Sequence, residues 1–207
     1  LMKYSNKILK IEKVSVDNIA KKYNTPTYCY SYNQLKKNIQ NFKKNIDLLN
    51  QNKSLMAAYN STIKLLLGSI NKGGKIIFMG NGGSAADAQH LNAELVGKFL
   101  KKRKAIPSIS LTTDTSVITS ISNDVNYKFI FSRQIESIAK KNDIIFGITT
   151  SGKSKNIIEG FKKAKNIKCK TVCLTKHNYP KNLNNLCDII IPVNADRVDR
   201  IQELHIF

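Results

Sequence analysis

Hydrophobic residues in the later three quarters of the chain fall into five short runs, separated by stretches long enough for a helix. The runs are KIIFMG (75–80), SISL (108–111), DIIFGIT (143–149), KTVCLT (170–175) and CDIIIPV (187–193). Apolar runs without strict alternation are typical of parallel strands covered on both faces. The pattern therefore predicts an α/β fold, a doubly wound five-stranded parallel sheet flanked by helices.

A longer amphipathic pattern precedes these runs. Its apolar positions follow near-helical spacing and comprise Leu55, Met56, Tyr59, Ile63, Leu66, Leu67 and Ile70. Gly73 and Gly74 end the pattern, as glycines commonly do after the last helical turn. We expect a helix over residues 54–72 that packs on the sheet or on a neighbouring subunit.

The first 50 residues form a separate pattern. SVDNIAKKYN (15–24) predicts a helix, Pro26 marks a break, TYCYSY (27–32) favours an extended segment, and a second helix is expected from Asn33. We therefore expect a small helix–strand–helix appendage over residues 1–50 and a main domain over residues 51–207. No low-complexity linker marks the boundary, which we place between residues 46 and 54.

The chain of 207 residues carries a formal net charge of +20, with 34 Lys and Arg against 14 Asp and Glu. Most of these cations are lysines spread along the chain among many Asn and Ile residues, as an AT-rich coding sequence would impose. The densest cluster comprises Lys98, Lys101, Lys102, Arg103 and Lys104. Nucleic-acid binding would favour arginines in one concentrated patch, so we do not expect it.

The cysteines and the apolar stretches bear on location. Cys29, Cys169, Cys173 and Cys187 include no CxxC pair, which favours reduced thiols in a cytoplasmic protein. No apolar stretch has the length of a membrane span, so we expect no membrane partner.

Two loops rich in small and hydroxyl residues follow predicted strands. In GNGGSAAD (80–87), Gly80, Gly82 and Gly83 permit a tight turn and Ser84 can cap the next helix. In TTSGKS (149–154), the hydroxyl side chains are Thr149, Thr150, Ser151 and Ser154. One such loop more often only caps a helix, but two in one parallel sheet predict a phosphate site at helix N-termini. Lys153 lacks Walker spacing, so a nucleotide triphosphate is not indicated.

His90 and Glu94 lie four residues apart, on one face of the helix predicted after the glycine loop. This pair could supply two Zn²⁺ ligands, or a carboxylate base beside an imidazole. Such pairs are more often surface contacts, but their position after the glycine loop favours a functional role. Gln202 and His205 lie on a predicted terminal helix, where a polar face is the simpler interpretation.

Four stretches together resemble one family. Over residues 54–207, GNGGSAADAQHLNAELVGKF, SNDVNYKFIFSRQIE, TTSGKSKNII and DRIQELHI are similar to the phosphoheptose isomerases, the sedoheptulose 7-phosphate isomerase branch of the SIS-domain phosphosugar-binding proteins. The resemblance implies a homotetramer with sites at subunit interfaces. It also implies an aldose–ketose isomerase that makes a manno-heptose 7-phosphate for lipopolysaccharide or capsule.

The resemblance also implies roles for individual residues. Asn81, Gly82, Gly83, Ser84, Asn123 and Asp124 would hold the sugar, with Gln202 nearby, and Thr149, Thr150, Ser151 and Ser154 would hold its phosphate. His90, Glu94 and Gln202 would bind Zn²⁺. Glu94 would also move the proton between C1 and C2 through a cis-enediol. The family's last helix continues beyond RIQELHI to a second histidine, so we expect a last helix shorter than the family's and do not give His205 that role.

The N-terminal piece resembles another family. VSVDNIAKKYNTPTYCYSYNQLKKNIQNF (14–42) is similar to the start of diaminopimelate decarboxylase, a PLP-dependent barrel enzyme, but ends before that family's PLP lysine.

Besides the isomerase, two alternative functions remain open. One is a non-catalytic SIS module that binds phosphosugars or proteins, like the DnaA initiator-associating protein, and the other is an inactive gene remnant.

Overall fold

The computed structural model describes residues 2–5 and 7–207, and the chain divides into two compact units, Leu1–Asp47 and Leu48–Phe207. The larger unit contains a five-stranded sheet of order β5-β4-β6-β7-β8, in which every neighbouring pair is parallel. Its strands are β4 (Ile76–Gly80), β5 (Ser108–Ser110), β6 (Ile144–Ile148), β7 (Lys170–Lys176) and β8 (Ile189–Val193). The predicted doubly wound α/β fold and all five predicted strands are confirmed.

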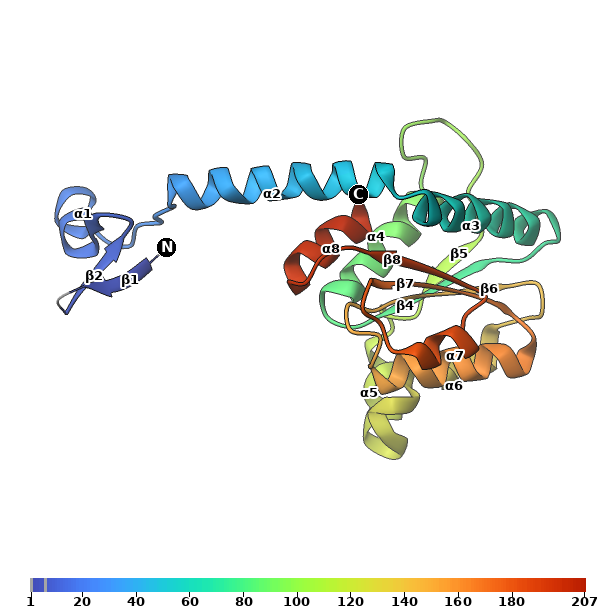
Figure 1. Ribbon diagram of the computed structural model, residues 1–207. Coiled ribbons are helices and arrows are strands. Elements are labelled where there is room, and N and C mark those ends of the chain that lie inside the picture. The colour runs from blue at the N-terminus through green and yellow to red at the C-terminus, as the bar shows by residue number, and fades with distance from the viewer. Residues whose placement is uncertain (1, 6) are drawn as a thin grey trace. The chain divides into compact units, whose positions relative to one another are not determined.

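Helices cover both faces of this sheet (Figure 1). One face carries α3 (Lys53–Asn71), α4 (Gly83–Val96) and α8 (Val198–Ile206), and the other carries α6 (Ile130–Ile138) and α7 (Lys155–Ile167). Shorter helical segments connect these elements: α5 (Thr115–Ile121), the π-helical η1 (Ser122–Asn126), and the 3₁₀ segments η2 (Tyr127–Phe129) and η3 (Lys181–Asn185). The predicted helices over residues 54–72 and at the terminus are confirmed.

The main hydrophobic core lies between the sheet and the α6–α7 layer. Ile77, Met79 and Ile145 extend from the strands toward Phe131 and Phe161, and all five side chains are buried. A β-carbon at position 147 would lie 2.4 Å from the ring of Phe161, so β6 needs Gly147 for the helix to approach. Burying several large apolar side chains at about 1.5–3 kcal/mol each is the main term that holds α7 on the sheet.

At the amino ends of the strands, here called the amino edge of the sheet, one acidic side chain connects neighbouring segments. Asp143 is 3% exposed and accepts hydrogen bonds from the backbone N–H groups of Lys75 and Lys140. Its other contact is an ion pair of 2.6 Å with the Lys75 Nζ atom, which also donates to the Ile138 carbonyl. The charge of Asp143 is therefore buried with its partners in place, which links the starts of β4 and β6.

The smaller unit differs from the predicted helix–strand–helix. It begins with an antiparallel sheet of β1 (Met2–Ser5), β2 (Ile8–Ile11) and β3 (Val14–Ser15), followed by α1 (Val16–Tyr23) and by α2 (Tyr32–Gln51) as far as Asp47. Both predicted helices are present, but residues 27–31 form no strand and the three short strands were not anticipated. An extended segment becomes a strand only when a neighbouring strand pairs with it, and residues 27–31 have no such neighbour among the described residues.

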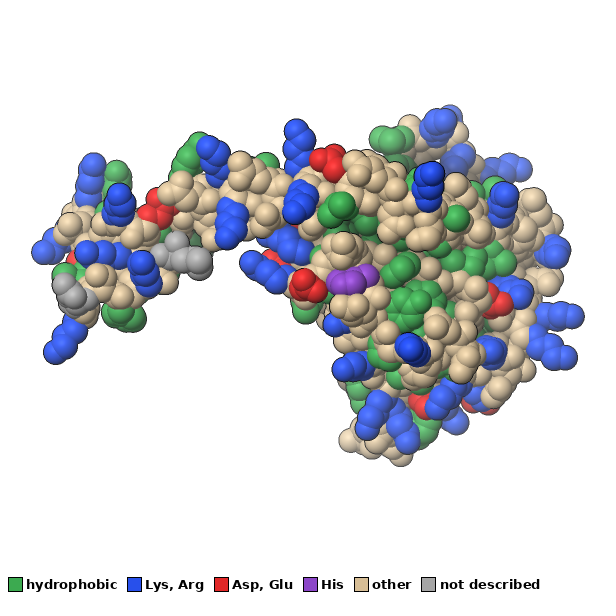
Figure 2. Space-filling view, in the orientation of Figure 1, with side chains coloured by type: hydrophobic (Ala, Val, Ile, Leu, Met, Phe, Trp, Pro, Cys, Tyr) green, Lys and Arg blue, Asp and Glu red, His purple; other side chains and the backbone are tan. Residues whose placement is uncertain are grey.

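Lysine and arginine side chains are scattered over the face seen in Figure 2, with few acidic side chains between them. They do not gather in one stripe on that face. Across the described parts of the chain, residues 2–5 and 7–207, no helix combines the length and apolar character required to span a membrane.

Candidate phosphosugar site at the carboxyl edge of the sheet

The strand order reverses between β4 and β6. From β4 the chain moves outward to β5, and it then returns to the other side of β4 and continues through β6, β7 and β8. Ligands of doubly wound sheets bind at such a switch point, beyond the carboxyl ends of the strands. Both loops predicted to bind phosphate lie here, because one follows β4 directly and the other follows β6.

The glycine loop turns the chain from β4 into α4. Gly82 is the N-cap of α4 and has a φ of +54°, a left-handed conformation that glycine adopts at little cost. Gly82 has no side chain to cap the helix, so the first N–H groups of α4 remain directed at the space beyond β4. Ser84 is buried in the first turn. This arrangement suits an anion or a sugar hydroxyl.

The hydroxyl-rich loop turns the chain from β6 into α7. Thr149 is 4% exposed, and its Oγ1 atom accepts a hydrogen bond of 3.1 Å from the Gly152 N–H. Gly152 has a φ of +67°, and a β-carbon there would lie 2.8 Å from the Pro180 ring. Ser154 is the N-cap of α7 but makes no side-chain capping bond, so its hydroxyl is available. Thr149 therefore shapes the loop, while the helix N-terminus and Ser154 can face an anion.

Side chains join the two loops directly. Asn81 donates to Asn156 at 2.9 Å and Asn156 donates back at 2.8 Å, so the two amides form a reciprocal pair. The Tyr127 hydroxyl donates to the Asn81 Oδ1 atom at 3.1 Å. Sequence reasoning missed Asn156 and Tyr127. The available signal for Asn156 was its position in the first turn after TTSGKS, where an asparagine can bond across to a neighbouring loop.

His90 and Glu94 extend from one face of α4, as their spacing predicted. The His90 Nε2 and Glu94 Oε1 atoms lie 3.8 Å apart, a distance of electrostatic contact rather than of a hydrogen bond. The side chains are 58% and 33% exposed, respectively, so both can reach a ligand. An imidazole and a carboxylate in this arrangement could share a metal ion or act on one proton.

The chain resembles known proteins over most of its length. The sequence model of the SIS-domain family matches residues 40–176. A phosphoheptose isomerase of Campylobacter jejuni is 50% identical over 144 residues, covering 69% of this chain and 76% of the relative. One from Helicobacter pylori is 43% identical over 152 residues, covering 73% and 79%. This chain belongs to the phosphoheptose isomerase family of SIS-domain proteins.

Solved structures agree with this assignment. The phosphoheptose isomerase from Neisseria gonorrhoeae has a TM-score of 0.76 at 34% identity, and the match covers 84% of this chain and 91% of that one. The enzyme from Francisella tularensis has a TM-score of 0.78 at 29% identity, covering 86% and 93%. The fold of the larger unit is therefore that of the phosphoheptose isomerases.

Gln202, which the family resemblance assigned to the metal, lies at the other end of α4 from Glu94. A β-carbon at position 83 would lie 1.9 Å from the Gln202 Nε2 atom, so the amide occupies the space that Gly83 leaves open. Since a helix rises 1.5 Å per residue, His90 lies about 10 Å further along the axis of α4 than Gly83. Gln202 therefore adjoins the glycine loop, and the described residues contain no cluster of three His, Cys, Asp or Glu that could hold a metal.

Asn123 and Asp124 lie on the π-helical segment η1, where both are exposed. The Asn123 amide donates to the Asp124 carboxylate at 2.8 Å, and among the described residues neither side chain bonds to the two loops. The helical segment is nevertheless connected to the site, because Tyr127 directly follows it and bonds Asn81. The sugar-binding role of Asn123 and Asp124 stays a prediction.

Four buried polar atoms near the site lack hydrogen-bond partners among the described residues: one carboxylate oxygen of Asp87, the Thr175 hydroxyl oxygen and both ring nitrogens of His205. Burial raises the pKa of Asp87, and the charge of His90 opposes this shift. His205 is 7% exposed, so burial lowers its pKa to about 4, while a backbone contact with Thr175 acts in the opposite direction. His205 is therefore buried and neutral, and it does not lie on an exposed polar face of α8.

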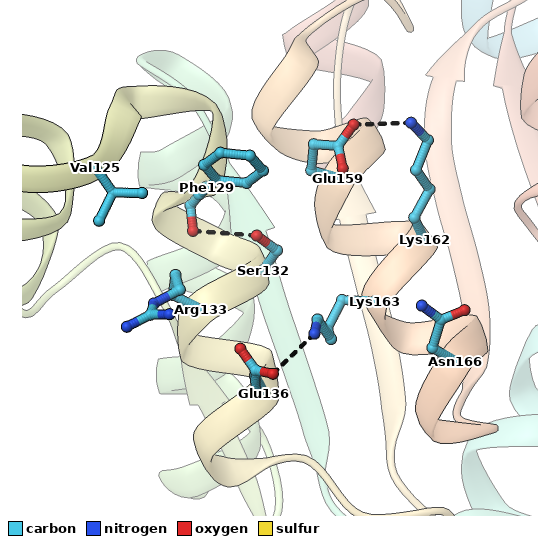
Figure 3. A pocket seen from close by; sticks show the side chains of 9 residues that line it. All are labelled: Val125, Phe129, Ser132, Arg133, Glu136, Glu159, Lys162, Lys163 and Asn166. Carbon is cyan, nitrogen blue, oxygen red and sulfur yellow. Dashed lines mark hydrogen bonds and ion pairs between the residues drawn. The ribbon is translucent and has the colours of Figure 1, made fainter.

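A separate groove of about 420 Å³ lies between α6 and α7 (Figure 3). Phe129 and Val125 contribute its apolar part, and ion pairs occupy its walls, Lys163 with Glu136 at 2.9 Å and Lys162 with Glu159 at 2.8 Å. The Lys163 contact lowers the pKa of Glu136 through a hydrogen bond and charge attraction. None of the predicted site residues lines this groove, and its charged groups are largely paired with each other.

Proposed function

We propose that this protein interconverts sedoheptulose 7-phosphate and D-glycero-D-manno-heptose 7-phosphate, as an aldose–ketose isomerase of lipopolysaccharide or capsule heptose synthesis. One observation carries the proposal: the two loops at the switch point are joined by the Asn81–Asn156 amide pair, and the helix that begins at the first loop carries His90 and Glu94. Membership of the phosphoheptose isomerase family supports the choice of substrate.

In this proposal the hydroxyl-rich loop holds the phosphate. The N-terminus of α7 offers N–H groups and a partial positive charge, while Thr150, Ser151 and Ser154 add hydroxyl donors. The side chain of Lys153 is exposed and adds positive charge at the rim. Asn81, Gly82, Gly83 and Ser84 then hold the sugar between the loops, with the Gln202 amide against Gly83.

Glu94 moves the proton. Its carboxylate takes a proton from C1 of the open-chain ketose and returns it to C2 of the enediol, while the hydroxyl proton of O1 passes to O2, which gives the aldose. The transfer needs the carboxylate ionised and within hydrogen-bond reach of both carbons. Because Glu94 lies at the other end of α4 from the glycine loop, the Glu94 that acts on the sugar comes from a neighbouring copy in the proposed tetramer. His90 lies 3.8 Å from Glu94 and can hydrogen-bond the sugar oxygens where negative charge develops.

We also propose a Zn²⁺ cofactor held by His90 and Glu94, whose imidazole and carboxylate are both ordinary zinc ligands. When bound, the ion would supply Lewis-acid stabilisation of the enediolate oxygen. Gln202 does not join this pair within one chain, since its amide lies against Gly83. Its role as a third ligand stays a prediction, and its contact with Gly83 better supports a sugar-binding role.

We propose that the protein assembles as a homotetramer in the cytoplasm. Along α3, Met56, Tyr59, Ile63 and Leu67 are 38–55% exposed, which leaves an apolar strip for another copy to cover. The four cysteines are free thiols, which favours a reducing compartment. Light scattering of the purified chain tests the assembly: a tetramer that dissociates on Leu67→Glu supports it, and a monomeric wild type contradicts it.

The deciding experiment is an isomerisation assay on the purified chain with sedoheptulose 7-phosphate, with and without Zn²⁺ after chelation. We expect turnover that the chelator removes and Zn²⁺ restores. A folded protein that binds the phosphosugar without turnover would instead support a non-catalytic SIS module. That alternative draws on one observation, the separation of Gln202 from the His90–Glu94 pair.

A further inference from the structure

The segment between α4 and β5 contains one side chain that turns back onto the helix. The Arg103 guanidinium donates three hydrogen bonds to backbone carbonyls. Its Nη2 atom donates to Glu94 at 2.6 Å, and its Nη1 atom donates to Leu95 at 2.8 Å and to Lys104 at 3.0 Å. Arg103 therefore binds the main chain of the residue proposed as the catalytic base.

The Glu94 and Leu95 carbonyls belong to the last turn of α4, which ends at Val96, whereas the Lys104 carbonyl lies in the segment that follows. The last four carbonyls of a helix have no partner within the helix, and a buried or well-held end needs one from elsewhere. Besides Arg103, the turn is held by the Gly97 N–H on Ala93 at 2.8 Å and the Ile106 N–H on Leu95 at 3.0 Å. Of these bonds, only that from Arg103 reaches the Glu94 carbonyl.

The neighbouring cations do not share this role. Lys98, Lys101, Lys102 and Lys104 are exposed, and in the part of the chain that the structure describes their ammonium groups have no recorded hydrogen bond or ion pair. The guanidinium is a planar fork that can donate to successive carbonyls at once, whereas an ammonium group is a single centre. The arginine is therefore chemically distinct within the basic cluster.

We propose that Arg103 is a positioning residue, which fixes the last turn of α4 so that the Glu94 carboxylate meets the sugar carbons. This inference rests on the proposed function, because it assigns Glu94 as the base. Arg103 acts through the main chain of Glu94, away from the carboxylate. Its loss should therefore change where the carboxylate lies and leave the phosphate-binding loops unchanged.

The test compares Arg103→Gln and Arg103→Lys with the matched control Lys102→Gln, which removes the same charge from the same segment. For each we would measure kcat and KM with sedoheptulose 7-phosphate and hydrogen exchange of the α4 backbone amides. We expect Arg103→Gln to lower kcat on the order of 10-fold with KM nearly unchanged, because small misplacements of a catalytic group are costly. Exchange should rise only in the last turn of α4. Arg103→Lys should recover part of the rate, and Lys102→Gln should match the wild type.

The pH profile separates positioning from a simple loss of stability or charge. Arg103 contacts backbone carbonyls and not the Glu94 carboxylate. Arg103→Gln should therefore lower the maximum of the pH profile of kcat without shifting the pH at which kcat falls on the acidic side. Equal kcat values in Arg103→Gln and Lys102→Gln would overturn the inference, even if exchange had increased. A parallel Glu94→Gln variant identifies the other failure: if it turns over normally, the proposed base is wrong, and the role given to Arg103 is wrong with it.

Discussion

The polar groups at the two ends of the parallel strands, the amino edge and the carboxyl edge of the sheet, differ in whether they have hydrogen-bond partners. At the amino edge, Asp143 is buried, and its carboxylate is paired with the Lys75 ammonium and accepts hydrogen bonds from two backbone N–H groups. At the carboxyl edge, glycines replace side chains, and helix N-termini and hydroxyl groups remain directed at open space. Saturated polar groups stabilise the fold, whereas groups left without partners are free to bind a ligand. Substitutions at the two edges should therefore affect different measurements.

The largest effect on function should come from α4, the helix that begins at the carboxyl edge. We expect Glu94→Gln to lower kcat on the order of 1000-fold, or about 4 kcal/mol of activation free energy, because the amide cannot accept the proton. Binding of the phosphosugar, measured by calorimetry, and the melting temperature should be unchanged. Glu136→Gln, on the distant groove wall, is the control and should retain full turnover. Undiminished activity in Glu94→Gln would remove it as the base.

The largest effect on stability should come from the amino edge. We expect Asp143→Ala to lower the free energy of unfolding by about 3 kcal/mol, because two backbone N–H groups lose their acceptor and the Lys75 ammonium, which keeps the Ile138 carbonyl, loses its charged partner. Urea titration measures this change, and kcat of the folded fraction should stay at the wild-type value. Glu159→Ala breaks an exposed pair with Lys162 and should leave the stability nearly unchanged. A large loss of kcat in folded Asp143→Ala would contradict the division between the edges.

A pH titration of stability would test whether His205 is buried in its neutral form. His205 has a pKa of about 4 in the folded chain against an ordinary value of 6.5, so the unfolded chain binds its proton more readily. Its contribution to stability is fully present above pH 6.5 and is lost as the pH falls toward 4, by up to about 3 kcal/mol. His205→Gln should weaken this part of the pH dependence in urea titrations. An identical pH dependence in wild type and variant would show that His205 is not buried in its neutral form.

The smallest effect should follow from separating the two loops. Asn156→Ala removes one half of the amide pair with Asn81, and a lost hydrogen-bond pair of this kind is worth about 1–2 kcal/mol. We expect KM for the phosphosugar to rise about 10-fold while kcat changes little. Asn166→Ala, further along α7, is the control. An unchanged KM would mean that the loops keep their spacing without the pair.

Much of this organisation was available from the sequence. Continuous apolar runs predicted all five strands, and their glycine- and hydroxyl-rich endings predicted where a ligand could bind. The i, i+4 spacing also placed His90 and Glu94 on one helix face. Local patterns succeed here because a parallel strand and a helix face are each determined by residues close in the chain.

The sequence was wrong about residues 27–31, since an extended segment needs a pairing partner that composition cannot supply. It also missed Asn156, and it did not anticipate the contact of Gln202 with Gly83, which brings together residues more than a hundred positions apart.

The sequence by itself thus determined the strands, the loops and the types of chemical group at the carboxyl edge. Only the tertiary structure decided which distant residues meet: Asn81 with Asn156, Gln202 with Gly83, and Arg103 with the end of α4. The physical reason is that hydrogen bonds act over about 3 Å, so contacts between distant segments depend on the packing of whole helices and strands. Spacing along the chain sets which residues are available, and packing sets which of them touch.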